Sequence, residues 1–182
     1  MPDSARLRLV HPPVEGDPTE PLSLDDAFRR YAPYVAKIGL RILGRSDEVD
    51  DLVQDVFLAA HRGIARLRSP EAVRGWLATV AVRCARRRLR LRAWKSLLGL
   101  EAAPGYEELA DPSASPEDRA IIARVYRLLE GLPADERIAW VLHRVEEEPL
   151  PRVALLVGRS LATVKRRIAR AARAIEEGLS DG

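Results

Sequence analysis

The chain has 182 residues, of which 47% are hydrophobic, 31% charged and only 5% aromatic, and its formal net charge at pH 7 is +3. This balance excludes a chain that is disordered throughout, and a core of aliphatic residues favours helices over sheets. The single cysteine, Cys84, excludes an internal disulfide and a cysteine-clustered zinc site, and the three histidines lack the spacing of metal ligands. We therefore expect an all-α protein without a metal or cofactor.

The chain opens with a proline-rich stretch. Residues 1–22 contain five prolines and no apolar periodicity, which predicts a disordered tail. The tail has no apolar signal core, and no later segment approaches the roughly 20 uninterrupted apolar residues that span a bilayer. The sequence therefore predicts a cytoplasmic protein without membrane insertion.

Two amphipathic helices are predicted next. The first begins near Ser23 and ends at Gly44, with an apolar stripe at Phe28, Tyr31, Val35, Ile38 and Ile42. The second starts after Ser46, and its apolar face leaves a patch pointing outward that consists of Asp50, Asp51, Gln54 and Asp55. Because like charges on one helix repel each other, this patch suggests a binding partner, although a merely solvated face is the alternative.

A third helix is predicted to open at Pro70. Its buried stripe is expected to consist of Val73, Trp76, Leu77, Val80, Ala81, Cys84 and Leu91. The remaining circumference carries Arg83, Arg86, Arg87, Arg88, Arg90 and Arg92, with no acidic residue in the run. The local field should be strongly positive, so a polyanion is the expected partner.

A break between two domains is predicted from about Leu97 to Glu117. This stretch contains glycine, proline, serine and acidic residues without a sustained stripe, the composition of an extended linker. Helical periodicity resumes near Pro116 and runs to Gly131, and Pro133 opens a further helix. The sequence therefore predicts two small helical domains joined by a flexible linker.

The last part of the chain has the pattern of a helix-turn-helix. A short helix from Pro149 to Val157 precedes a turn at Gly158, and Ser160 can cap a longer final helix. The outer surface of this helix is expected to present Lys165, Arg166, Arg167, Arg170 and Arg173. A recognition helix needs such side chains for contacts with phosphates and base edges.

The order of these features resembles the extracytoplasmic-function (ECF) sigma factors of the sigma-70 family. DEVDDLVQDVFLAAH, from Asp47 to His61, is similar to the helix that binds the polymerase clamp, and RGWLATVAVRCARRRLR resembles the helix that follows it. LPADERIAWVLHRVEEEPLPRVALLVGRSLATVKRRIARA is similar to the carboxy-terminal promoter-reading domain. The resemblance spans almost everything from about Leu24 to Leu179.

The resemblance implies a division of the chain into four parts. Residues 1–22 would be the tail, 23–95 the region 2 domain, 96–116 the acidic linker and 117–180 the region 4 domain. The implied partners are core RNA polymerase and promoter DNA. An anti-sigma factor is a common further partner in the family, but no residue here identifies one.

The resemblance also implies roles for individual residues. The polymerase clamp would be bound by Asp50, Asp51, Gln54 and Asp55. The downstream (minus-ten) element would be met by Arg83, Arg86, Arg87 and Arg90. The upstream (minus-thirty-five) element would be bound by Ser160, Thr163, Lys165, Arg166, Arg167, Arg170 and Arg173.

The chain departs from the family pattern at two places. Arg83 and Arg87 stand where the family often has Asn and Asp, so the downstream-element preference cannot be copied from relatives. Pro151 and Arg152 replace what is usually a more acidic first helix of the turn motif. These changes leave the architecture intact.

Two other classes of function compete with this interpretation. A stand-alone helix-turn-helix regulator would bind promoters without polymerase, but it would leave the acidic helix and the arginine-rich helix without a purpose. An enzyme fits poorly, because the sequence has no phosphate-cradling glycine loop, no nucleophile elbow and no acid-base pair among its histidines. The sequence therefore predicts a nucleoid-associated bacterial transcription factor that is not an enzyme.

Overall fold

The computed structural model describes residues 23–61, 63–64, 67, 69–98, 106, 109 and 113–180. All the regular structure in these residues is helical, as the aliphatic composition predicts. In chain order the helices are α1 (Leu24–Leu43), α2 (Val49–Ala60), α3 (Pro70–Leu97), α4 (Pro116–Glu130), α5 (Ala134–Arg144), α6 (Leu150–Val157) and α7 (Leu161–Ser180). The proline-rich tail lies outside the described residues.

Local sequence explains most helix boundaries. Ser23, Ser69 and Ser115 each cap a helix, accepting a hydrogen bond from the backbone N–H three residues later. Gly44 and Gly158 end α1 and α6 in the left-handed conformation, with φ of 69° and 65°. These boundaries confirm the predicted order of helices.

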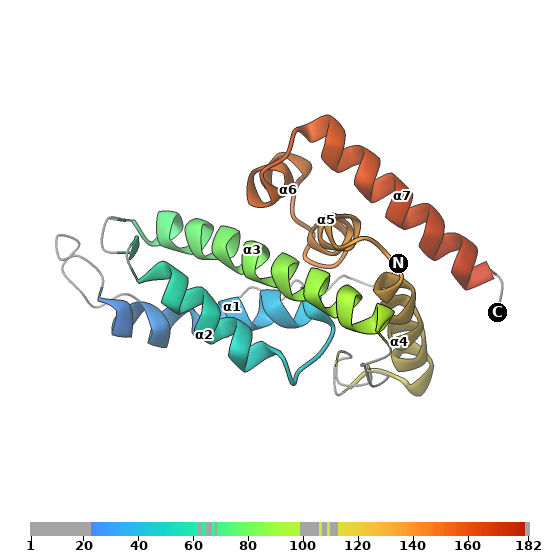
Figure 1. The fold of residues 1–182 in the computed structure, drawn as a ribbon, viewed down its shortest axis with the longest axis horizontal. Helices are drawn as coiled ribbons and strands as arrows, with labels where there is room; N and C mark the ends of the chain where they lie inside the picture. The colour runs from blue at the N-terminus through green and yellow to red at the C-terminus, as the bar shows by residue number, and fades with distance from the viewer. Residues whose placement is uncertain are drawn as a thin grey trace.

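The helices form two domains. Helices α1, α2 and α3 pack on one another, and α4, α5 and α6 pack with α7 in the second domain. Figure 1 shows α3 in the middle of the molecule, with α1 and α2 on one side and α5 and α6 on the other. The predicted all-α architecture of two small domains is confirmed.

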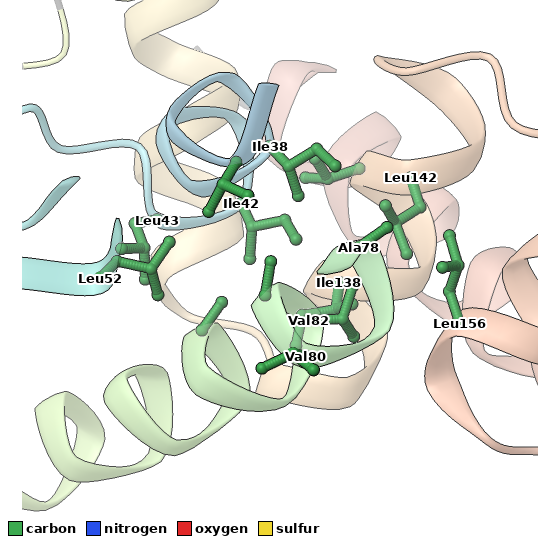
Figure 2. Close-up of a cluster of buried hydrophobic side chains, with 14 of the residues drawn as sticks. Ile38, Ile42, Leu43, Leu52, Ala78, Val80, Val82, Ile138, Leu142 and Leu156 are labelled. Carbon is green, nitrogen blue, oxygen red and sulfur yellow. The ribbon is translucent and has the colours of Figure 1, made fainter. Parts of the chain in front are cut away.

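The two domains share one hydrophobic core. Helix α5 contacts α1 and α3, and α6 also contacts α3. In Figure 2, Ile138 and Leu142 of α5 lie against the same cluster as Ile42 of α1 and Val82 of α3, and all four side chains are 0 or 1% exposed. Close packing of this kind holds the domains together in addition to the covalent linker.

The second domain also caps the C-terminus of α1. The last carbonyls of a helix have no intrahelical partner. Here the Tyr126 hydroxyl donates to the Arg41 carbonyl (2.9 Å), and Arg137 donates from Nε to Ile42 (2.8 Å) and from Nη2 to Leu43 (2.7 Å). These carbonyls therefore find their partners across the domain boundary.

Two residues in the middle of the predicted linker, Tyr106 and Leu109, are described and buried. Tyr106 and Leu109 belong to the hydrophobic cluster, and the Leu109 carbonyl accepts a hydrogen bond from Arg41 (3.2 Å). The Tyr106 hydroxyl donates to the Glu130 carboxylate. These parts of the predicted linker are therefore anchored to the folded domains.

The predicted apolar stripes hold in the middle of the helices and fail near some ends. Leu91 was predicted to be buried but is 57% exposed, whereas Leu89 and Arg92 beside it are buried, so Leu91 lies on the outward side of α3. Ile121, in the apolar periodicity that predicts the helix from Pro116 to Gly131, is also exposed. Neither position changes the arrangement of the domains.

Candidate nucleic-acid interface

The acidic patch of α2 is only partly open to solvent. Asp50, Asp51 and Gln54 are exposed, as predicted. Asp55 instead pairs with two arginines of α3, at 2.6 Å from Arg88 and 3.2 Å from Arg87. The exposed part of the patch therefore lies in the first turns of α2, where Asp51 is also 4.0 Å from Arg88.

The arginines of α3 differ in their surroundings. Arg83 and Arg87 are exposed, and Arg90 has a side chain 62% exposed. Arg86 has a side chain only 17% exposed, because it faces the second domain. The arginines that the sequence predicted over the circumference of α3 are therefore divided between an open face and a covered one.

Arg92 was predicted to contribute to the positive surface but lies in the protein interior, with a side chain 5% exposed. It pairs with Glu48 (2.8 Å) and Glu130 (3.1 Å) and donates to the Leu43 carbonyl (3.1 Å). Arg137 pairs with the other Glu130 oxygen at 2.9 Å. A buried charge needs such partners, and both arginines find them where α3, α4 and α5 meet.

Glu130 is the acidic centre of this cluster. Burial by itself would raise the pKa of its carboxyl, but the hydrogen bond from Tyr106 and the charges of Arg137 and Arg92 outweigh burial and lower it. Burial and the bond to Glu130 raise the pKa of the Tyr106 hydroxyl in turn. Glu130 is therefore held as a carboxylate, and Tyr106 as its donor.

The helix-turn-helix has the geometry that its sequence predicts. Helices α6 and α7 contact each other, and the turn between them begins with Gly158 in the left-handed conformation. The Ser160 hydroxyl caps α7, accepting from the Thr163 N–H (3.3 Å) and lying 2.9 Å from the Thr163 hydroxyl. Ser160 and Thr163 thus have a structural role at the start of α7.

The basic residues of α7 also separate into two sets. Lys165, Arg166 and Arg173 are exposed, as predicted. Arg170 is exposed as well and lies 3.5 Å from Glu136. Arg167 was predicted on the outer surface, but its side chain is 18% exposed and pairs with Asp135 at 3.0 Å.

Asp135 is a residue that the sequence did not single out. In the first turn of α5 an acidic residue is explained by the helix dipole alone, so nothing in the local pattern marks it. In the structure its carboxylate lies 2.7 Å from Arg86 and 3.5 Å from Arg90, in addition to Arg167. One carboxylate therefore contacts basic residues of both predicted DNA-binding helices.

Other kinds of site are absent from the described residues. No group of three or more His, Cys, Asp and Glu side chains is placed to hold a metal ion in these parts of the chain. Among the same residues, no helix combines the length and the apolar character that crossing a membrane requires.

Comparison with family models agrees with this geometry. Residues 27–95 match the model described as Sigma-70 region 2, and residues 122–175 match the model described as Sigma-70, region 4. The two matches coincide with the two helical domains, and the second contains the helix-turn-helix. The fold and its basic helices thus define a two-domain transcription factor.

Relatives of known class extend the comparison. The ECF RNA polymerase sigma factor SigM of Mycobacterium tuberculosis is 30% identical over 168 residues, which are 92% of this chain and 80% of the relative. The ECF RNA polymerase sigma-E factor of Escherichia coli is 27% identical, covering 81% of each chain. A longer relative, the probable RNA polymerase sigma factor RfaY of Xanthomonas campestris, is 31% identical, and the match spans only 37% of it. The chain belongs to the ECF class of the sigma-70 family of RNA polymerase sigma factors.

Solved structures share the fold. The sigma factor RpoE of Bartonella quintana, solved with the anti-sigma factor NepR, superposes with a TM-score of 0.62 at 20% identity, covering 86% of this chain and 96% of that one. CnrH, solved with the cytosolic domain of CnrY, gives a TM-score of 0.56 at 23% identity, covering 87% and 88%. At these identities the likeness concerns the fold alone.

Proposed function

We propose that this protein binds core RNA polymerase and directs it to promoters, using its first domain for the polymerase clamp and the minus-ten element and its helix-turn-helix for the minus-thirty-five element. The observation that carries this proposal is that the chain exposes an acidic surface on its first domain and a basic surface on its second domain, in the order found in the family. The acidic surface includes Asp50 and Asp51 of α2, and the basic surface includes Lys165 and Arg166 of α7. A protein that joins a polymerase to DNA needs both.

On the polymerase side, Asp50, Asp51 and Gln54 are the proposed contacts. Asp55 has a second role, because its pairing with Arg87 and Arg88 ties α2 to α3. A variant at Asp55 would therefore alter the fold of the domain together with any contact to polymerase. Asp50 and Asp51, which are exposed, are therefore the better positions for testing the contact with polymerase.

Reversal of the exposed charges tests the polymerase contact. Asp50→Arg combined with Asp51→Arg should abolish co-purification with core polymerase, because docked charges that face a basic partner contribute several kcal/mol in order of magnitude. Glu117→Arg combined with Asp118→Arg is the matched control, since these acids also occupy the first turn of a helix and are exposed. Equal retention of core polymerase by both double variants would contradict the clamp assignment.

On the DNA side, the proposed contacts to the minus-ten element are Arg83, Arg86, Arg87 and Arg90. The proposed contacts to the minus-thirty-five element are Ser160, Thr163, Lys165, Arg166, Arg167, Arg170 and Arg173. Arg83, Arg166 and Arg173 are exposed and can meet DNA without rearrangement. Arg86 and Arg167 cannot, because Asp135 holds both.

Reconstituted transcription with core polymerase on a genomic DNA library tests the whole proposal. Transcripts should start downstream of a shared pair of sequence elements, and none should form without the protein. A stand-alone regulator is the second candidate, since a helix-turn-helix can bind DNA by itself. Specific promoter binding without polymerase, together with no stimulation of core enzyme, would favour that candidate.

The remaining parts of the proposal follow from family membership. The protein would act in the bacterial cytoplasm, at the nucleoid when it is bound to polymerase, and it would initiate transcription without catalysing a reaction of its own. The structural neighbours were solved with an anti-sigma factor and with the cytosolic domain of CnrY. A protein inhibitor of the anti-sigma kind is therefore a proposed further partner.

A further inference from the structure

The C-terminal end of α3 carries an apolar patch that consists of Leu91, Trp94, Leu97 and Leu98. These four side chains are between 57% and 84% exposed. The other large hydrophobic residues that are exposed in the described part of the chain each stand on a different helix: Phe28, Leu58, Ile121, Leu155 and Leu161. Scattered apolar residues are ordinary on a protein surface, whereas a group of neighbours indicates a binding surface.

Helical spacing places the side chains of the apolar patch together. Leu91, Trp94 and Leu98 are separated by three and four positions, so they lie on one side of α3 and of the turn that follows it. Leu97 is three positions after Trp94 and lies beside it. The patch therefore forms one continuous surface of about two helical turns.

Basic side chains surround the apolar patch. Arg87 lies one turn before Leu91, and Arg87, Arg90 and Lys95 are all exposed. The two arginines keep this exposure while they pair with aspartates of α2 and α5. The sequence has no acidic residue from 72 to 100. A ligand that covers the patch therefore meets positive charge at its edge, so we expect the ligand to be anionic as well as apolar.

A hollow of about 300 Å³ lies beside the apolar patch and shares Leu97 with it. The hollow lies between the last turns of α3 and the turn that joins α4 to α5, and its apolar lining includes Leu89, Ala93, Leu132 and Pro133. Arg90 and Ser96, which are both exposed, also line it and can donate hydrogen bonds. A hollow of this size and lining can hold one small anionic group.

The hollow also has buried charged groups in its wall. Arg92 and Arg137 line it together with Glu130, whose carboxylate pairs with both. The Nε atom of Arg92 is buried and has no hydrogen-bond partner among the described residues, although both of its Nη atoms are paired. Buried donors without a partner are uncommon in proteins. With Arg90, three arginines and one glutamate line the hollow, which favours an anion.

An anionic phospholipid has both of the chemical features that this surface would recognise. Single-stranded nucleic acid also carries phosphates, but its bases stack on aromatic side chains, and three of the four residues in the apolar patch are leucines. Leucine and tryptophan flanked by arginine and lysine are typical of a helix that lies at the interface of a membrane. The composition of the surface therefore favours lipid over nucleic acid.

We propose that the C-terminal end of α3 binds anionic phospholipids at a membrane surface. The apolar patch would contact the boundary between headgroups and acyl chains, and Arg87 and Lys95 would pair with headgroup phosphates. One headgroup would enter the hollow, where Arg90 and Ser96 donate to its phosphate. Four side chains bury far less apolar surface than a spanning helix, so the binding is peripheral and reversible.

Co-sedimentation of the full chain with vesicles tests the proposal without polymerase or DNA. The protein should sediment with vesicles made of equal parts of phosphatidylglycerol and phosphatidylcholine. Its affinity for vesicles of phosphatidylcholine alone should be at least roughly tenfold lower, because each basic residue near the surface is attracted to anionic lipid. Added salt should weaken binding to the anionic vesicles, since it screens this attraction.

A matched pair of leucines tests the apolar patch. Leu97→Glu should lower the affinity for the anionic vesicles roughly tenfold, because it places a carboxylate against the acyl boundary. Leu58→Glu is the control, since Leu58 is 75% exposed, compared with 84% for Leu97, and the change in charge is the same. Leu58 lies in the last turn of α2, which leads into the opposite end of α3. The control should stay within about twofold of the wild type, because salt screens a charge at that distance.

A second pair of variants tests the basic residues. Arg90→Gln combined with Lys95→Gln should lower the affinity for the anionic vesicles roughly tenfold and leave the weak binding to phosphatidylcholine unchanged. Arg29→Gln combined with Arg30→Gln removes the same charge from exposed positions of α1. This control should stay within about twofold. An equal loss of affinity in both double variants would contradict a specific site and would show attraction to net charge alone.

The fluorescence of Trp94 reports the contact directly. Its emission should move to shorter wavelength when the protein binds the anionic vesicles, because the exposed ring leaves water. Trp94→Phe should remove this shift and keep the affinity within about threefold, since phenylalanine is also apolar. Trp76 and Trp140 are partly buried and lie outside the apolar patch, so their emission should not change.

Three results would overturn the proposal: no sedimentation with the anionic vesicles, equal affinities of Leu97→Glu and Leu58→Glu, or a shift of Trp94 emission with a random single-stranded oligonucleotide but not with vesicles. The last result would assign the apolar patch to nucleic acid. A dimeric wild type that Leu97→Glu converts to monomers, without vesicle binding by either, would assign it to a second copy of the chain and would also overturn the proposal.

Discussion

Helices α3 and α7 both carry runs of basic residues, yet the structure uses the two runs differently. In α3, the residues Arg86, Arg87, Arg88, Arg90 and Arg92 all pair with carboxylates from α2, α4, α5 or the turn before α2. In α7, Lys165, Arg166 and Arg173 are exposed, and no ion pair joins them to another described residue. A run of basic residues that has no acidic neighbours in sequence can therefore be largely neutralised by carboxylates from other helices in the folded protein.

The comparison shows why charge runs are an incomplete guide to binding surfaces. An arginine of α3 meets carboxylates of other helices because α3 lies in the middle of the molecule, whereas α7 lies at its edge (Figure 1). Paired and partly buried arginines position helices, and exposed unpaired ones remain available to phosphates. The two roles can be separated by matched substitutions in the two helices.

The largest expected difference is in stability. Arg92→Leu in α3 should lower the free energy of unfolding by about 3 kcal/mol, because it removes a buried cation that pairs with Glu48 and Glu130. Arg173→Leu in α7 should change it by less than about 0.5 kcal/mol, since the side chain is exposed. Urea unfolding followed by circular dichroism measures both. An equal decrease in the free energy of unfolding in both variants would contradict the assignment of Arg92 as a structural residue and Arg173 as an exposed, unpaired one.

Sequence preference should separate residues within α7. Arg166→Ala should cost roughly 1 to 3 kcal/mol on the preferred minus-thirty-five element and relax the preference at one position, because early residues of a recognition helix reach base edges. Arg173→Ala should weaken all sequences alike, as loss of a phosphate contact does. Transcription from a library randomised in that element gives a sequence logo for each variant. Identical logos with lower yield would make both residues phosphate contacts.

Low pH should destabilise the contact between the C-terminal end of α3 and Glu130, which pairs with Arg92. The pKa of Glu130 in the folded protein lies below its ordinary value of 4.5, so its contribution to stability is complete above that pH and is lost as the pH falls through the folded pKa. Glu130→Gln has no carboxylate to protonate. The difference in urea midpoint between wild type and variant should therefore shrink on acidification from about pH 7 to about pH 3. A constant difference would show that the charge of Glu130 contributes nothing to the cluster.

The smallest expected effect compares two arginines at neighbouring turns of α3. Arg83 is exposed without an ion pair to another described residue, whereas Arg87 is exposed and pairs with Asp55 at 3.2 Å. Arg83→Ala should therefore impair promoter melting more than Arg87→Ala, with polymerase binding unchanged in both. Permanganate footprinting of unpaired thymines measures the melting. Normal melting by both variants would leave these arginines as solvated surface.

Sequence periodicity alone was sufficient to predict the helices. Apolar spacing and the caps at Ser23, Ser160 and Gly44 are local signals, because a helix depends on residues three or four positions apart. The same locality explains why the helix-turn-helix and the exposed residues Asp50, Asp51, Lys165 and Arg166 were predictable. Each of these features depends on neighbours within one or two helical turns.

Only the tertiary structure decided which charged residues are free. Asp55, Arg92 and Arg167 stand in runs that look exposed in sequence, but their partners lie 32 to 44 positions away in the chain. Asp135 had no local signal at all, since its contact with Arg86 exists only where the two domains meet. Ion pairs between distant segments depend on how the helices pack, and helical periodicity specifies which face of each helix is buried but not which other helix covers it.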